Sequence, residues 1–120
     1  MASLNMGISY DFTNEKIDEK VEAGKIGNYA LGYMDDGTFI VKYVGRSDTD
    51  LNRRLKEHLG EHPKSYKRFK FSYASSEKAA FEKECENYHD FEPSFNTDHP
   101  DQPAGKKYQC PRCKKFEGDK

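Results

Sequence analysis

Three polar side chains in this sequence stand where apolar residues are expected, and their types suit chemistry on a phosphate group. Arg54 and His58 are four residues apart in a segment whose leucines recur with helical spacing, so both project at the edge of its apolar stripe. Glu84 falls inside the apolar arc of a later helical segment, where an unpaired carboxylate costs solvation free energy. Glu84 therefore needs a cation, and two explanations are open: an ion pair within the fold, with Arg54 as the candidate, or a bound metal ion.

Two tyrosines add a further group, on a predicted β-hairpin. The segments 27–34 and 38–45 are rich in aromatic and β-branched residues and flank an Asp-Asp-Gly sequence at 35–37, which favours a tight turn. With a three-residue loop, Tyr29 would face Tyr43 directly across the two strands. With a two-residue turn, the two phenols would lie on opposite faces of the hairpin.

The elements that position these side chains follow from periodicity and from helix caps. The predicted elements are a helix over 15–23, the hairpin, a helix that follows cap candidates at 47–50 and runs through 59, a strand over 68–74, and a helix from 75 or 76 to about 91. This order predicts an α+β fold with a small three-stranded, mostly antiparallel sheet flanked by helices.

The length and composition predict one small domain. A chain of 120 residues is about one domain long, and 34% hydrophobic residues allow only a modest core. No apolar run approaches the length of a membrane span, and the N-terminus lacks a secretory pattern, so we expect no membrane association. Three cysteines argue against a disulfide framework and favour a reducing compartment, so the expected location is cytoplasmic.

The formal net charge of −1 conceals an alternation of charge along the chain. Residues 42–70 carry nine basic and four acidic side chains, and residues 102–120 carry six and two. The segments 1–41 and 71–101 are acidic and offset them. Ordinary solvated surface is one explanation of the basic block and the basic tail, and a local phosphate-binding face is the other.

The ordered set of these features resembles the GIY-YIG endonuclease superfamily over about residues 26–97. The family pattern runs G-x-Y, Y-[IV]-G and L-x-x-R-[LI]-x-x-H, followed by a glutamate on a later helix and a P-x-x-N segment. In this chain the motifs read GNY at 27–29, YVG at 43–45, LNRRLKEH at 51–58 and PSFN at 93–96. Asn28 departs from the family, which has isoleucine there. The helical arc and the spacing to Pro93 both select Glu84 over Glu82 as the family glutamate.

The resemblance implies phosphodiester hydrolysis in DNA with one divalent ion, Mg²⁺ or Mn²⁺. Glu84 would hold the ion, and Arg54 would stabilise charge on the phosphate oxygens. Tyr29 and Tyr43 would position the attacking water, with Tyr29 as the expected general base. His58 would contact phosphate or relay a proton. The expected catalytic set is thus Tyr29, Tyr43, Arg54, His58 and Glu84.

DNA is the expected partner, and Arg46, Arg53, Lys56 and Asn96 are the expected contacts. Family members act in repair, restriction, homing and junction resolution, and their specificity usually comes from appended domains. Around the domain at 26–97, this chain has an N-terminal leader and short helix at 1–25 and a basic tail at 98–120, so we expect a homodimer or a partner protein to supply specificity. A noncatalytic nucleic-acid-binding module of the same fold is the alternative function, and an accessory domain without a nucleic-acid role is the third.

The basic tail carries half of a zinc knuckle. Cys110 and Cys113 have C-x-x-C spacing, and a structural zinc ion needs four ligands. The other candidates nearby are His89, His99 and Cys85, and we expect Cys85 to pack in the core. Three possibilities are open: zinc held by both tail cysteines, His99 and a fourth ligand; zinc shared between two chains; or a basic, reduced tail without a metal.

Overall fold

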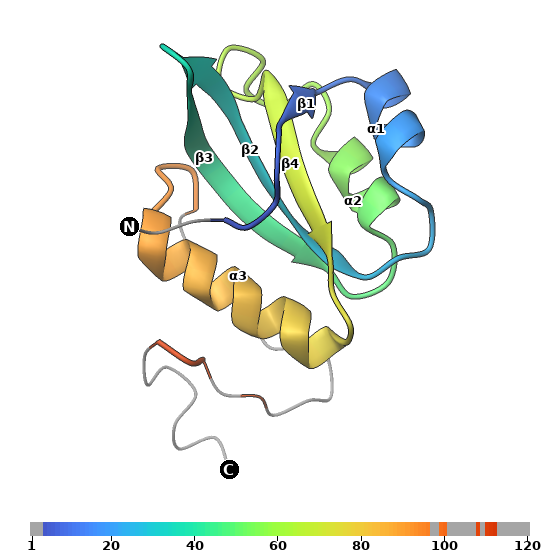
Figure 1. The fold of residues 1–120 in the computed structure, drawn as a ribbon, viewed down its shortest axis with the longest axis vertical. Coiled ribbons are helices and arrows are strands. Elements are labelled where there is room, and N and C mark those ends of the chain that lie inside the picture. Colours follow the sequence, from blue (N-terminus) through green and yellow to red (C-terminus); the bar gives the residue numbers. More distant parts are fainter. Residues whose placement is uncertain (1–3, 97–98, 101–107, 109, 113–120) are drawn as a thin grey trace.

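The computed structural model describes residues 4–96, 99–100, 108 and 110–112, which form an α+β fold (Figure 1). Four antiparallel strands make one sheet in the order β1-β4-β2-β3. The elements are β1 (Tyr10–Asp11), α1 (Asn14–Lys20), β2 (Gly27–Asp35), β3 (Thr38–Ser47), α2 (Leu51–Glu57), β4 (Arg68–Tyr73) and α3 (Glu77–Phe91). The α+β class is confirmed, and the sheet has four strands where three were predicted.

The helices cover both faces of the sheet (Figure 1). The larger core lies between the sheet and the pair α1 and α2, and consists of Ile17, Val21, Tyr29, Leu31, Leu51, Leu55, Tyr66 and Phe69. On the other face, α3 contacts β3 and β2 beside a smaller cluster that includes Ala30 and Val44. Because side chains alternate along a strand, Tyr29 and Ala30 of β2 point into different cores.

The additional strand is β1, which the sequence pattern did not predict. Tyr10 and Asp11 of β1 pair with the first residues of β4. Leu4 and Met6, which precede β1, are buried in the cluster on the α3 side of the sheet. The part of the predicted N-terminal leader at 4–12 therefore belongs to the fold, which the sequence did not indicate. A two-residue strand is too short to show the alternation that reveals longer strands.

The hairpin turn is two residues long, where a three-residue loop was one of the two predicted alternatives. Asp35 pairs with Thr38, and the two residues between them, Asp36 and Gly37, both have positive φ. That backbone conformation matches the twist of the flanking strands, and Gly37 adopts it without steric cost. This turn alone would have placed the two phenols on opposite faces.

A β-bulge in β3 returns the second phenol to the face of the first. Leu31 pairs with Tyr43, although the turn by itself would bring Lys42 to that position, so β3 contains one extra residue here. The bulge reverses the alternation of β3, and Tyr43 lies on the same face as Leu31 and Tyr29. Tyr29 itself pairs with Gly45. Direct pairing of the two tyrosines was therefore wrong, and they are diagonal neighbours.

Each helix begins at a side-chain cap. Thr13, Asp50 and Ser76 accept hydrogen bonds from backbone N–H groups in the first turns of α1, α2 and α3. α1 ends at Lys20, before the predicted end, because Val21 is already extended. α3 ends at Phe91, as predicted. Among the described residues, no helix combines the length and apolar character that crossing a membrane requires.

Candidate active site

A hydrogen-bonded chain links β2 to the end of α2 and to the loop that follows. The phenol oxygen of Tyr29 lies 2.7 Å from Nε2 of His58, and Nδ1 of His58 lies 2.8 Å from Oε1 of Glu61. Because the Glu61 carboxylate only accepts hydrogen bonds, Nδ1 carries the proton and Nε2 accepts the O–H of Tyr29. The chain thus fixes the tautomer of His58 and the direction of the phenol O–H.

Two more tyrosines place their rings around His58. The ring of Tyr43 is 5.1 Å from that of His58 and 6.2 Å from that of Tyr29, measured between centroids. The ring of Tyr66 is 6.3 Å from both Tyr43 and His58. Tyr29 and His58 are buried, whereas Tyr43 is only half-buried. One phenol is therefore enclosed, and the other lies at the edge of the site.

Burial and neighbouring charges shift the pKa of both phenols. Burial raises the pKa of Tyr29 well above its ordinary value, and it also raises the pKa of Tyr43. Arg54 lowers the pKa of both through its positive charge and through hydrogen bonding, while the charge of Glu84 raises both. Arg54 and Glu84 therefore share one electrostatic environment with the two phenols.

Arg54 lies on α2 at the solvent edge of this environment. Its side chain is 41% exposed, compared with 81% for Arg53, which agrees with the predicted position of Arg54 at the edge of the apolar stripe. Its guanidinium donates to Oε1 of Glu57 at 2.7 Å, within the same helix. A polar cavity of about 250 Å³ opens beside it, lined by Ser47, Thr49, Asp50, Arg53, Arg54 and Glu57. An anion from solvent can therefore approach the guanidinium.

Glu84 is buried on α3 and forms an ion pair with Arg46 near the end of β3. Oε1 of Glu84 accepts a hydrogen bond from Arg46 at 2.6 Å, and each side chain is 10% exposed. Burial raises the pKa of Glu84, and the guanidinium of Arg46 opposes that shift. Arg46 also pairs with Asp48 at 2.9 Å. An ion pair was one of the two open explanations for Glu84, and the structure shows one. Its partner is Arg46 and not the predicted Arg54, which pairs with Glu57 within α2.

The motif glycines leave room for the site. Gly45 lies under the ring of Tyr29, and a β-carbon at this position would overlap that ring. A β-carbon at Gly27 would overlap the backbone oxygen of Ser72 and lie 2.8 Å from the side chain of Leu51. Both glycines are thus required by close approach between strands or between a strand and α2.

Asn28, the departure from the family motif, points away from the site. It is fully buried, and its Nδ2 donates to the backbone oxygen of Ala80 on α3 at 2.9 Å. Its side chain lies on the opposite face of β2 from Tyr29. Asn28 therefore connects the sheet to α3 and makes no direct contact with the phenol.

The four side chains expected to contact DNA have different surroundings. Arg46 is held in its ion pairs, and Lys56 forms an ion pair with α1 at 2.6 Å. Arg53 is the most exposed of the three cations. The amide of Asn96 accepts from the backbone N–H of Val44 at 2.8 Å and donates to its oxygen at 3.0 Å. Asn96 thus fastens the chain after α3 to the edge of β3.

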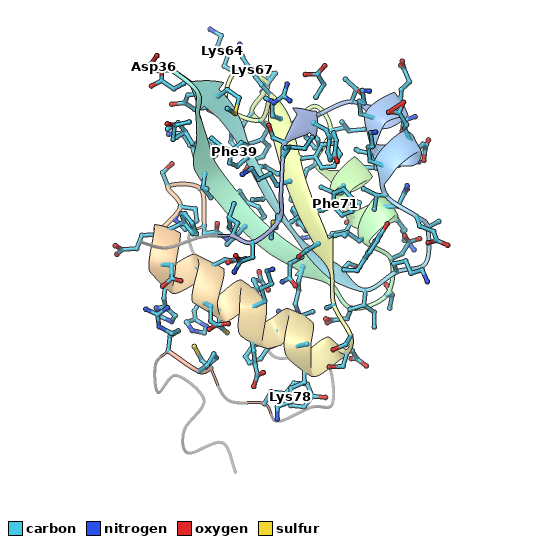
Figure 2. The ribbon with its side chains drawn as sticks, in the orientation of Figure 1. Asp36, Phe39, Lys64, Lys67, Phe71 and Lys78 are labelled. Atoms are coloured by element: carbon cyan, nitrogen blue, oxygen red, sulfur yellow. The ribbon has the colours of Figure 1, made fainter. Side chains whose placement is uncertain are left out.

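The loop between α2 and β4 supplies site residues that the sequence analysis missed. Glu61 and Tyr66 both contact His58, yet this loop has no hydrophobic period that would reveal their orientation. The one available signal was spacing, since Glu61 is three residues after His58. The same loop carries Lys64 and Lys67, which line a cavity with Tyr33 and Met34 of β2, at the end of the sheet where Asp36 marks the hairpin turn (Figure 2).

A second group of side chains, at α3 and the chain beyond it, could hold a metal ion. Cys85, His99 and Cys110 each offer one ligand atom, and these atoms lie within 4.8 Å of one another. Cys85 is fully buried, as expected, and its thiol belongs to this group as well. Cys113, the other half of the predicted knuckle, lies outside the described residues.

Comparisons of the chain with protein-family models, with curated proteins and with solved structures find no match. The groups of the site themselves indicate what chemistry it can support. Tyr29 and His58 can accept and pass on a proton, and Arg54 can bind an anion at the solvent edge. Glu84 supplies a buried carboxylate for a cation.

Proposed function

We propose that this protein is a metal-dependent DNA endonuclease with a GIY-YIG-type site that hydrolyses phosphodiester bonds. The observation that carries the proposal is the 2.7 Å hydrogen bond between Tyr29 and His58, with Tyr43 beside it and Arg54 acting on both phenols. These groups come from β2, β3 and α2, and Glu84 of α3 acts on the same phenols. A constellation of a base, a proton relay, a guanidinium and a carboxylate suits phosphoryl chemistry.

Tyr29 is the proposed general base. As its oxygen takes a proton from the attacking water, its own O–H proton passes to Nε2 of His58. Glu61 accepts from Nδ1 and stabilises the imidazolium that results. Arg54 opposes the effect of burial on the pKa of Tyr29, which favours the loss of that proton.

Arg54 is proposed to bind the scissile phosphate. Its guanidinium is half-exposed beside the polar cavity, and its planar donors suit two phosphate oxygens at once. Positive charge at this position stabilises the charge that develops on those oxygens in the transition state. Tyr43, at the edge of the site, is proposed to orient the attacking water.

Glu84 has the donor type that a hard divalent ion prefers. Mg²⁺ and Mn²⁺ bind carboxylate oxygens and keep most of their waters. Arg46 donates to Oε1 of Glu84, which leaves Oε2 for a cation. When bound, such an ion would act as a Lewis acid on the phosphate. Glu84 thus fits one divalent ion, with Arg46 as its direct competitor for the carboxylate.

DNA is the proposed partner, with a homodimer or a second protein supplying specificity. The exposed Arg53 lies beside Arg54 in the lining of the polar cavity, so a backbone bound there would meet two guanidinium groups. At the hairpin end of the sheet, Lys64, Lys67 and Arg68 line a separate cavity of about 520 Å³. Both surfaces carry cations that can neutralise phosphates.

Zinc is the proposed metal for the second group of ligands. Thiolate sulfur and imidazole nitrogen, as offered by Cys85, His99 and Cys110, are donors that zinc prefers, whereas Mg²⁺ takes oxygen. The two centres would therefore be chemically distinct. Different chelators and ions can address them separately.

Cleavage of supercoiled plasmid and branched DNA in Mg²⁺ or Mn²⁺ tests the nuclease proposal. Glu84→Gln and Arg54→Ala should each lower the cleavage rate by about 10²–10³-fold, because the first weakens binding of the divalent ion and the second removes the cation that stabilises the transition state. Matched controls are Glu82→Gln and Lys78→Ala, which change charges of the same sign on α3 outside the site, and both should cleave at the wild-type rate.

The same assay separates the alternatives. Salt-sensitive DNA binding without cleavage would identify a noncatalytic nucleic-acid-binding module of this fold. Neither binding nor cleavage would identify an accessory domain without a nucleic-acid role. Cleavage that survives both Glu84→Gln and Arg54→Ala would contradict the assigned site.

A further inference from the structure

Four metal-ligating side chains meet where α3 contacts the chain that follows it. Cys85 and His89 are four residues apart on α3, so they share one face of the helix. His99 and Cys110 approach this face from two later points in the sequence. The ligand atoms of Cys85, His99 and Cys110 lie within 4.8 Å of one another, and His89 lies beside the last two.

Two distances in this cluster are those expected between ligands of one tetrahedral ion. Nε2 of His89 lies 3.3 Å from Nε2 of His99 and 3.5 Å from Sγ of Cys110. With Zn–N bonds of about 2.05 Å and Zn–S bonds of about 2.3 Å, tetrahedral geometry separates two nitrogens by about 3.3 Å and a nitrogen from a sulfur by about 3.6 Å. The spacing of His89 to His99 and to Cys110 therefore matches that of two ligand pairs around one ion.

The surroundings of the cluster are those of a closed structural centre. Cys85 and Cys110 are buried and pack with Phe81, whose ring centroid lies 6.2 Å from that of Tyr108. The backbone N–H of Arg112 donates to Sγ of Cys110 at 3.5 Å. The side chain of Arg112 also pairs with Asp90 of α3. The thiols are thus shielded from solvent on the helix side.

We propose that Cys85, His89, His99 and Cys110 bind one zinc ion in a structural centre that fastens His99 and Cys110 to α3. Four protein ligands fill the tetrahedral shell and leave no position for a substrate, so the ion has a folding role and no catalytic one. His89 is the ligand that the sequence analysis named but did not choose, and it takes the place of Cys113. The centre exists whether or not the chain cleaves DNA, so its test is independent of the nuclease assay.

Metal analysis of the full chain, purified without chelator, tests the stoichiometry. We expect about one zinc per chain, as four ligands from one chain require. A ratio near one zinc per two chains would show an ion shared between chains and would overturn the proposal. An absence of zinc that persists after incubation with added Zn²⁺ would also overturn it.

Substitutions test the ligand set. His89→Ala and Cys110→Ser should each lose bound zinc, whereas the matched controls His62→Ala and Cys113→Ser should keep it. If His89→Ala kept zinc and Cys113→Ser lost it, the fourth ligand would be Cys113 and not His89, and the proposed ligand set would be wrong. Circular dichroism of each variant establishes whether it remains folded.

Cobalt substitution gives a second measurement that needs no variant. Co²⁺ in the wild-type chain should show the intense visible bands of a tetrahedral site, with thiolate charge-transfer absorption of two sulfur ligands. Weak octahedral bands, or charge-transfer intensity matching three thiolates, would contradict the two-cysteine, two-histidine set. Removal of zinc with a strong chelator should lower the thermal unfolding midpoint, because the ion stabilises only the folded chain.

Discussion

Glu84 and Cys85 are neighbours on α3, yet they belong to centres that are assembled in different ways. Glu84 pairs with Arg46, and its charge raises the pKa of Tyr29 and Tyr43; paired strands and a packed core already hold these residues in position. Cys85 faces His99 and Cys110, which come from chain that forms no helix or strand in its described residues. The first centre needs no ion to exist, and the second joins separate chain segments through the ligand atoms themselves.

Because the two centres are assembled differently, a metal ion bound in each would have a different role. In the first centre an ion would be a catalytic cofactor, and its removal should stop DNA cleavage without unfolding the protein. In the second centre an ion would be part of the fold, as in other structural zinc sites. If the surrounding strands and helices hold the first centre in place, substitutions there should have the effects given below. A different outcome would remove the contrast between the two centres.

The largest effect is expected from removing the proposed base. Tyr29→Phe should lower the DNA cleavage rate by about 10²–10⁴-fold, because proton transfer to the phenol and on to His58 is lost. Tyr33→Phe, on the same strand but near the hairpin tip, is the matched control and should cleave normally. DNA affinity, measured by fluorescence anisotropy, should be unchanged in both. Wild-type cleavage by Tyr29→Phe would remove Tyr29 from the mechanism.

A smaller effect is expected from filling the space under the same ring. Gly45→Ala should destabilise the fold by about 1–3 kcal/mol, because the new methyl group overlaps the ring of Tyr29. Chemical denaturation measures this loss. Since the overlap is with that one side chain, adding Tyr29→Leu should cost less in the Gly45→Ala background than in the wild type. Additive costs would show that Gly45 is required for another reason.

The sequence predicted most of the fold and the buried position of Glu84, for reasons that can be traced to particular residues. Helical phase placed Glu84 inside an apolar arc and Arg54 at the edge of an apolar stripe, because one helix turns by a fixed angle per residue. It did not reveal Arg46 as the partner of Glu84, since that contact joins a strand end to a helix through tertiary packing. Tyr66 was missed because a loop has no period from which orientation can be read.

The smallest effect is expected at the cap of α2, the helix that carries Arg54. Asp50 accepts hydrogen bonds from the backbone N–H groups of Gly24 and Arg53, and these lower the pKa of its carboxyl below the ordinary 3.8. A carboxyl with a lowered folded pKa stabilises the fold above its ordinary pKa, and that stabilisation is lost as the pH falls through the folded pKa.

Asp50→Ala should therefore cost about 1 kcal/mol at neutral pH, as loss of an N-cap does. Thermal unfolding across a pH series should show this difference shrinking as the pH falls below 3.8. Asp50→Asn is the matched control, because its amide oxygen keeps the cap without a titratable proton. A difference between Asp50→Ala and wild type that stayed constant into acid would contradict a contribution from the carboxylate.

The extra residue in β3 has a consequence for how the hairpin can vary in length. Lys42 is the extra, unpaired residue of β3 between the hairpin tip and the site. The length of the turn therefore does not by itself determine which face of the sheet Tyr43 occupies. A tip longer by one residue, combined with deletion of Lys42, would leave both tyrosines on the same face. The outer end of the hairpin is thus free to diverge between related chains, or to accept redesign, while the inner end keeps its geometry.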